Sequence, residues 1–182
     1  MATIVTFRGI EEIDETTYWH LVPASGTNAQ MFFNNAIVGK GLVHSVSFMV
    51  ELDPNLANAQ TPYSIGTSEA EKERFFEDVR LARFPNLPSR LKAFYLFPSA
   101  EVANRAQREW FASELKVTVR AWIAQGSKVH EADAQLLRGS RESWPRNAER
   151  YWSGEKTNDP VPELLVHGSL YFPDWKSFEI PE

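Results

Sequence analysis

The chain has 182 residues, of which 43% are hydrophobic, 24% are charged and none is cysteine. This length fits one globular domain of roughly 100–200 residues. An aromatic content of 13%, with six tryptophans, supplies enough apolar surface for one sizeable core. We therefore predict a single domain over residues 1–182 and exclude whole-chain disorder. Without cysteine, disulfide scaffolds, thiolate zinc sites, iron–sulfur clusters and cysteine nucleophiles are excluded as well.

The formal net charge is −5, so the composition gives no overall electrostatic attraction to nucleic acid or to anionic membranes. One diluted basic cluster stands out, and its four arginines favour a solvated face: Arg138, Arg141, Arg146 and Arg150. Four acidic residues stand at positions 11, 12, 14 and 15, where a signal peptide needs an apolar run, and every apolar stretch is shorter than the ~18 residues of a membrane helix. We predict a cytoplasmic protein without a membrane partner.

Proline and glycine divide the first half of the chain into predicted elements. Residues 17–22 are typical of a strand, and residues 27–37 fit a short helix. Ser68 and Glu71 form a capping pair that predicts the start of an amphipathic helix, whose apolar side chains are Phe75, Phe76, Val79 and Leu81.

The next stretch has the clearest local signals. Residues 91–97 have the composition of a strand that Pro98 ends, and Ser99 is placed to cap a helix over residues 100–113. Residues 116–123 alternate apolar and polar side chains, which predicts a further strand.

Three weaker elements complete the chain. Residues 128–137 resemble a strand, residues 140–151 are irregular to helical, and residues 163–172 form a last predicted strand with Gly168 inside it. Strands outnumber helices without a regular β-α-β alternation, so the sequence predicts an α+β fold with a mixed or antiparallel sheet.

Common catalytic signatures are absent. Neither Ser25 nor Ser169 lies in a Gly-x-Ser-x-Gly context, and no glycine-rich phosphate loop occurs. A metal site is not supported, because no two histidines have the spacing of a helical metal site and no carboxylate lies at ligand spacing from any of the four: His20, His44, His130 and His167.

Three short segments each place one polar residue at a strand end in an apolar context: residues 18–26, 93–99 and 161–166. Their polar residues are His20, Tyr95 and Glu163. This ordered set resembles the ADP-ribosyltransferase superfamily, in particular its diphtheria-toxin-like branch. A bacterial domain family of unknown function assigned to that superfamily is similar in three further motifs: Ser89-Arg90, Tyr151-Trp152-Ser153-Gly154 and the stretch from Glu163 to Gly168.

The resemblance implies an ADP-ribosyltransferase-like fold, with a split sheet core and flanking helices, and NAD as substrate. Glu163 would stabilise the ribosyl cation and hold the 2′-hydroxyl. Tyr95 would stack on the nicotinamide, and His20 would bond the adenosine ribose. Arg90 would pair with the pyrophosphate. The implied cofactor-binding set is completed by two further residues, Ser99 and Trp152.

Each residue alone also has a structural interpretation. His20 and Tyr95 are ordinary strand residues, Glu163 can mark an exposed strand start, and Arg90 can bridge to Asp78 or Glu77. Trp152 fits a core position.

Val161 stands where arginine-modifying members of the superfamily carry Glu or Gln, which disfavours arginine as acceptor. The acceptor thus stays open between another protein side chain, nucleic acid, a small molecule and water. The alternative functions are a non-catalytic binding module on the same fold and an RNA-directed 2′-phosphotransferase-like enzyme.

Overall fold

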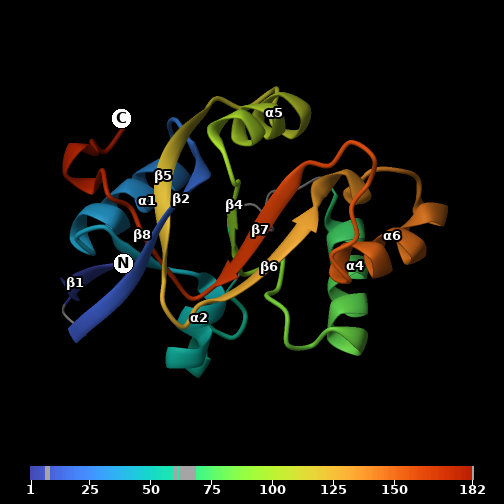
Figure 1. The fold of residues 1–182 in the computed structure, drawn as a ribbon, viewed down its shortest axis with the longest axis horizontal. Helices are drawn as coiled ribbons and strands as arrows, with labels where there is room; N and C mark the ends of the chain where they lie inside the picture. Colours follow the sequence, from blue (N-terminus) through green and yellow to red (C-terminus); the bar gives the residue numbers. More distant parts are fainter. Residues whose placement is uncertain (7–8, 60, 62–68, 182) are drawn as a thin grey trace. The chain divides into compact units, whose positions relative to one another are not determined.

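Figure 1 presents the computed structural model, which describes residues 1–6, 9–59, 61 and 69–181. Its strands form one five-stranded and one three-stranded sheet, and each pairing with a described register is antiparallel. With helices flanking these sheets, the predicted α+β class is confirmed.

The chain forms two compact units whose segments alternate along the sequence. Unit 1 comprises residues 1–44, 96–127 and 168–182, and unit 2 comprises residues 45–95 and 128–167. Neither unit is one continuous stretch, and the single domain expected over residues 1–182 stays a prediction.

Unit 1 contains the five-stranded sheet. Its strands follow the order β1 (Ala2–Thr6), β2 (Gly9–Pro23), β5 (Lys116–Ala124), β8 (Ser169–Tyr171) and β3 (Leu42–His44). The strands predicted over residues 17–22 and 116–123 are confirmed, although β2 begins eight residues earlier than expected.

The register between β2 and β5 shifts between Asp14 and Tyr18. The backbone N–H and the hydroxyl of Thr16 both donate to Asp14 Oδ1, at 3.0 and 2.9 Å. This local bonding gives the backbone an alternative to the ladder, which is the usual effect of an aspartate followed two residues later by a donor.

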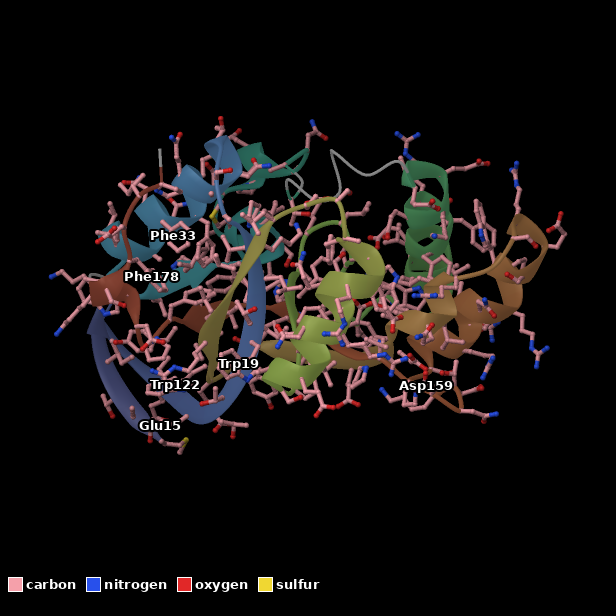
Figure 2. All side chains as sticks on the ribbon, turned by 90° about the horizontal axis from the view of Figure 1, so that it is seen from above. Glu15, Trp19, Phe33, Trp122, Asp159 and Phe178 are labelled. Atoms are coloured by element: carbon pink, nitrogen blue, oxygen red, sulfur yellow. The ribbon has the colours of Figure 1, made fainter. Side chains whose placement is uncertain are left out.

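Two helices belong to unit 1. Helix α1 (Thr27–Val38) confirms the predicted short helix, and its Phe33 ring lies 5.2 Å from the Phe178 ring near the end of the chain (Figure 2). Helix α5 (Ala100–Trp110) begins where predicted, because Ser99 Oγ accepts a hydrogen bond from Val102 N. A 3-10 turn, η4 (Trp175–Ser177), follows β8.

Unit 2 is organised around the three-stranded sheet, in the order β4 (Phe94–Leu96), β7 (Pro162–His167) and β6 (Lys128–Asp133). Helices α4 (Ala70–Arg83) and α6 (Trp144–Trp152) pack against each other beside β6 (Figure 1). The remaining elements of this unit are α2 (Val46–Leu52) and three 3-10 turns, η1 (Pro54–Leu56), η2 (Ala134–Leu137) and η3 (Arg141–Ser143).

Several predicted boundaries are corrected by the structure. The strand expected over residues 128–137 ends at Asp133, whose carboxylate caps the turn η2, and the helix expected over residues 100–113 ends at Trp110. The strand expected over residues 91–97 is limited to β4. Helix α4 is confirmed, but the predicted capping residue Ser68 lies outside the described residues.

The strand predicted over residues 163–172 is divided at Gly168 into β7 and β8, which belong to different sheets. Gly168 has a φ of +145°, and a Cβ atom there would lie 2.2 Å from Ser127 Oγ. Only glycine accommodates this close approach, so the chain changes sheets at this residue.

The cap at Ser99 generates the first testable prediction. Ser99→Ala removes the acceptor for Val102 N, and we expect it to lower the free energy of unfolding by about 1 kcal/mol. Ser99→Asp keeps an acceptor at the same position and serves as the control. Urea unfolding followed by circular dichroism measures both variants, and an alanine variant as stable as the wild type would contradict the role of the cap.

Candidate functional site

Unit 2 contains a buried cluster of charged and phenolic side chains, which we call the Arg90 cluster. Its members come from separate elements: Glu73 from α4, Arg90 from the segment before β4, Tyr151 from α6 and Glu163 from β7. Their exposed fractions are 3%, 1%, 0% and 5% respectively. Charged side chains are rarely buried so completely unless they are paired, and such clusters are candidates for functional sites.

The guanidinium of Arg90 is shared between two carboxylates. Its Nε and Nη2 donate to the two oxygens of Glu73, at 2.9 and 3.0 Å, in the bidentate geometry that suits a guanidinium. Its Nη1 donates to Glu163 Oε1 and to the hydroxyl of Tyr151, both at 2.5 Å. The Tyr151 hydroxyl in turn donates to Glu163 Oε1 at 2.7 Å.

The two oxygens of Glu163 differ in their surroundings. Within the described part of the chain, both hydrogen bonds to this carboxylate end on Oε1. Neither of these hydrogen bonds uses Oε2. The Glu163 side chain keeps 7% of its surface exposed, and its carboxylate is held through one oxygen only.

The electrostatics of the cluster follow from its burial and its charge balance. Burial by itself would lower the pKa of Arg90, but the charges of Glu73, Tyr151, Tyr95 and Glu163 raise that pKa well above its ordinary value. Burial also raises the pKa of the Tyr151 phenol well above its ordinary value, so Tyr151 keeps its proton. Two carboxylates around one guanidinium leave one excess negative charge.

Tyr95 belongs to the same surroundings. Its hydroxyl donates to the carbonyl oxygen of Arg90, and the guanidinium carbon of Arg90 lies 5.2 Å from its ring centroid. The same carbon lies 5.1 Å from the ring of Tyr151, within the range of a cation–π contact. Three of the six residues predicted from the sequence, Arg90, Tyr95 and Glu163, are thus brought together.

Trp152 is buried in unit 2, with an exposed fraction of 1%, and its indole N–H donates to the carbonyl oxygen of Phe76 at 2.7 Å. Its ring stacks on His130 at a centroid distance of 5.6 Å. Burial lowers the pKa of His130, so the imidazole is neutral at pH 7. Its Nε2 is bonded to the carbonyl oxygen of Tyr151 at 3.1 Å. These contacts give Trp152 the structural role that its sequence context also allowed.

The other two predicted residues lie in unit 1. His20 is part of an aromatic cluster, with centroid distances of 5.5 Å to Phe32 and 6.2 Å to Phe172. The hydroxyl of Ser99 caps helix α5. The structure thus places His20 and Ser99 in a different unit from the Arg90 cluster.

The start of β7, and with it Glu163, is held by Asp133 at the end of β6. Its carboxylate accepts hydrogen bonds from the backbone N–H groups of Gln135, Thr157 and Val161 and from the Thr157 hydroxyl, at 2.7–3.0 Å. Burial would raise the pKa of Asp133, but these donors outweigh it and lower the pKa. Val161, two residues before Glu163, is thereby fixed.

Sequence reasoning missed the roles of Glu73 and Tyr151. It expected Arg90 to meet Asp78 or Glu77 if its role were structural, but Glu77 pairs with Arg80 instead. The usable signal was the spacing within α4: the buried residues Glu73, Phe76 and Arg80 recur at helical spacing on one face, so a carboxylate lies on the apolar stripe.

The basic cluster of the sequence is partly neutralised by acidic side chains. Arg141 pairs with Glu71 at 2.7 Å and Arg150 with Glu155 at 2.9 Å. Among the described residues, no group of three or more histidine or carboxylate side chains is placed to hold a metal ion. No helix in the described ranges is long and apolar enough to span a membrane.

Comparison with known proteins gives a family. A model for a family described as protein of unknown function (DUF2441) matches residues 14–174. The matched range includes all four residues of the Arg90 cluster. The chain therefore belongs to the DUF2441 family. No curated protein matches it.

Removing the buried cation should destabilise the protein. Arg90→Met leaves Glu73 and Glu163 buried without a counter-charge, and we expect it to lower the free energy of unfolding by about 3–5 kcal/mol. Arg120→Met breaks the exposed pair with Asp174 and should lower the free energy of unfolding much less, because exposed ion pairs contribute little. Chemical denaturation compares the two, and equal effects would mean that the Arg90 cluster is not the stronger constraint.

Asp133 should make stability depend on pH. Because its pKa is lowered in the folded state, its contribution is present above the unfolded pKa of about 3.9 and is lost as the pH falls through the folded pKa. Asp133→Asn places an amide N–H₂ against backbone donors, and we expect a loss of about 1–3 kcal/mol at pH 7.

Urea unfolding at pH 7 and below pH 4 measures this effect. The loss caused by Asp133→Asn should shrink at the lower pH, since the wild-type carboxylate is then being protonated. Asp174→Asn changes an exposed aspartate with a lowered pKa and is the matched control. A loss at Asp133 that stays constant with pH would contradict the assignment.

Proposed function

We propose that the protein cleaves the bond between nicotinamide and ribose in NAD and transfers ADP-ribose to an acceptor. The observation that carries this proposal is the state of Glu163 in the Arg90 cluster. Its Oε1 is held by Arg90 and Tyr151, neither of these bonds uses Oε2, and the side chain is 7% exposed. A fixed carboxylate with one presented oxygen suits a reaction in which positive charge develops next to it.

The chemistry requires little beyond positioning and charge. When the glycosidic C–N bond of NAD breaks, its electron pair leaves with nicotinamide and the ribose carbon becomes cationic. Glu163 Oε2 would accept the ribose 2′-hydroxyl proton in a hydrogen bond and stabilise that cation. A nucleophilic atom of the acceptor then bonds to the ribose carbon and releases its proton to solvent water. Cleavage moves the positive charge from the pyridinium ring of NAD to the ribose carbon, and the excess negative charge of the cluster favours that charge where it lies nearest to Glu163.

The proposal assigns different roles to the remaining residues. Tyr95, whose ring lies beside the Arg90 guanidinium, is the candidate for stacking on nicotinamide. Because the Arg90 guanidinium is already bonded to Glu73, Glu163 and Tyr151, we assign it to holding Glu163 rather than to the pyrophosphate. The roles of His20 and Ser99 stay predictions from the sequence.

The test is Glu163→Gln. A glutamine retains an oxygen for Arg90 Nη1 and Tyr151, and the remaining Arg90–Glu73 pair is electrically balanced, so the variant should fold. We expect nicotinamide release from NAD to fall by at least about 100-fold, as for loss of a transition-state charge interaction. Chromatography of the released nicotinamide measures the rate, and calorimetry measures NAD binding in the same preparation.

Glu131→Gln is the matched control, because Glu131 lies on the neighbouring strand β6 and pairs with the exposed Lys156. It should retain the wild-type rate. Release by Glu163→Gln at the wild-type rate would overturn the role of Glu163. NAD binding without release by the wild type would favour a non-catalytic binding module instead.

A further inference from the structure

We infer that a pocket at the C-terminal ends of α4 and α6 binds an alkylammonium ion, the protonated form of a primary amine. The pocket lies within unit 2 and has a volume of about 610 Å³, which is typical of small-molecule sites. Its lining consists of residues 83–87, 130–131 and 152–154. No residue of the Arg90 cluster lines it, so this site is separate from the one assigned to NAD.

The walls of the pocket are held in place by hydrogen bonds and ring stacking. Arg80 is 7% exposed, and its Nη1 donates to the carbonyl oxygens of Pro85 and Leu87, at 3.2 and 2.9 Å. The rings of His130 and Trp152 stack at a centroid distance of 5.6 Å. The pocket is therefore formed before a ligand arrives, and binding costs little in ordering the protein.

The two helix ends offer the pocket hydrogen-bond acceptors rather than donors. The backbone N–H groups of Phe84, Ser153 and Gly154 are used in bonds that close the last turns of α4 and α6, at 2.7–3.2 Å. Pro85 has no N–H group. Within the described part of the chain, the carbonyl oxygen of Arg83, the last residue of α4, accepts no hydrogen bond. A helix C-terminus leaves such carbonyls for an outside donor.

His130 adds a further acceptor to the lining. Its Nε2 is bonded to the carbonyl oxygen of Tyr151, which can only accept, so Nε2 carries the proton of the neutral imidazole. The other ring nitrogen, Nδ1, then holds a lone pair, and no described residue donates to it. A ligand that carries N–H groups satisfies this nitrogen.

The electrostatic balance of the pocket favours a cation. Its two charged side chains have opposite sign, and each is already paired: Arg83 with Glu149, and Glu131 with Lys156 at 2.9 Å. Each of the two helix C-termini adds the equivalent of about half an elementary negative charge. The excess is thus negative, and no contact with the ligand has to be assigned to either charged side chain.

The class of ligand follows from these properties. A primary ammonium group supplies one positive charge and three N–H donors for the carbonyl and imidazole acceptors. Phe84 and Leu87 provide apolar surface on which an alkyl chain can pack. A carboxylate or phosphate would instead meet the negative ends of two helices, and an alcohol would gain nothing from the excess charge.

The experiment measures binding of n-hexylamine to the full chain at pH 7, where the amine is protonated. Chemical shifts in ¹⁵N–¹H correlation spectra should change at the lining residues 83–87 and 152–154 and should saturate. 1-Hexanol has the same chain without the charge, and we expect its affinity to be at least about 10-fold lower. Hexyltrimethylammonium keeps the charge but has no N–H donor, so it should also bind more weakly than hexylamine.

Three variants test the location. Asn86→Lys puts an ammonium group into the pocket from an exposed lining position, and we expect it to lower the affinity for hexylamine at least about 10-fold. Asn104→Lys makes the same change at an exposed position of α5 in unit 1 and should keep the wild-type affinity. His130→Phe retains a ring against Trp152 without the Nδ1 acceptor, and it should also bind hexylamine more weakly.

The outcomes are clear in either direction. Equal affinities for hexylamine and hexanol, equal affinities in the two lysine variants, or shifts spread over other acidic surfaces would each overturn the inference. If His130→Phe does not fold, the comparison of the two exposed lysine variants still decides the question. Binding is measured without NAD, so a failure to release nicotinamide would reject the proposed function and leave this site standing.

Discussion

The buried guanidinium of Arg90 is the constraint on which much of unit 2 depends. Removing a cation from water is costly, and here two carboxylates, a phenol and two aromatic rings offset that cost. These partners come from α4, β4, α6 and β7, so one side chain links four elements of the unit. A substitution at any one residue of the Arg90 cluster therefore alters the surroundings of the other three, and the effects of such substitutions on stability should not be additive.

The same constraint gives the candidate site its chemistry. Glu163 is held on one side by Arg90 and Tyr151, and the start of its strand is held by Asp133 through Val161 N. Positioning from two directions is what a carboxylate needs if it is to act on a bound molecule without reorganising first. In the proposed reaction, the excess negative charge of the two carboxylates around Arg90 would stabilise a cationic centre more than one carboxylate balanced by one guanidinium would.

Local signals predicted the elements that local forces determine. The cap at Ser99 and the alternation over residues 116–123 were recognisable because each depends on neighbours in the sequence. The N-terminal part of β2 was missed, because its acidic residues show no apolar alternation; residues 9–13 pair through the backbone with the preceding strand β1. In the candidate site, motif order indicated Arg90, Tyr95 and Glu163. Glu73 was missed, because a glutamate in an amphipathic helix is normally solvated, and only the tertiary position of Arg90 explains its burial.

The change of sheets at Gly168 has a consequence for how the protein is made. Strands β5 and β6 are consecutive yet belong to different sheets, and so do β7 and β8. In unit 1, β2 pairs with β5, and β5 in turn pairs with β8. In unit 2, β6 pairs with β7, which is synthesised later. Neither sheet can be completed before the last strands leave the ribosome. Until β7 and β8 have been synthesised, the chain therefore exposes unpaired strand edges.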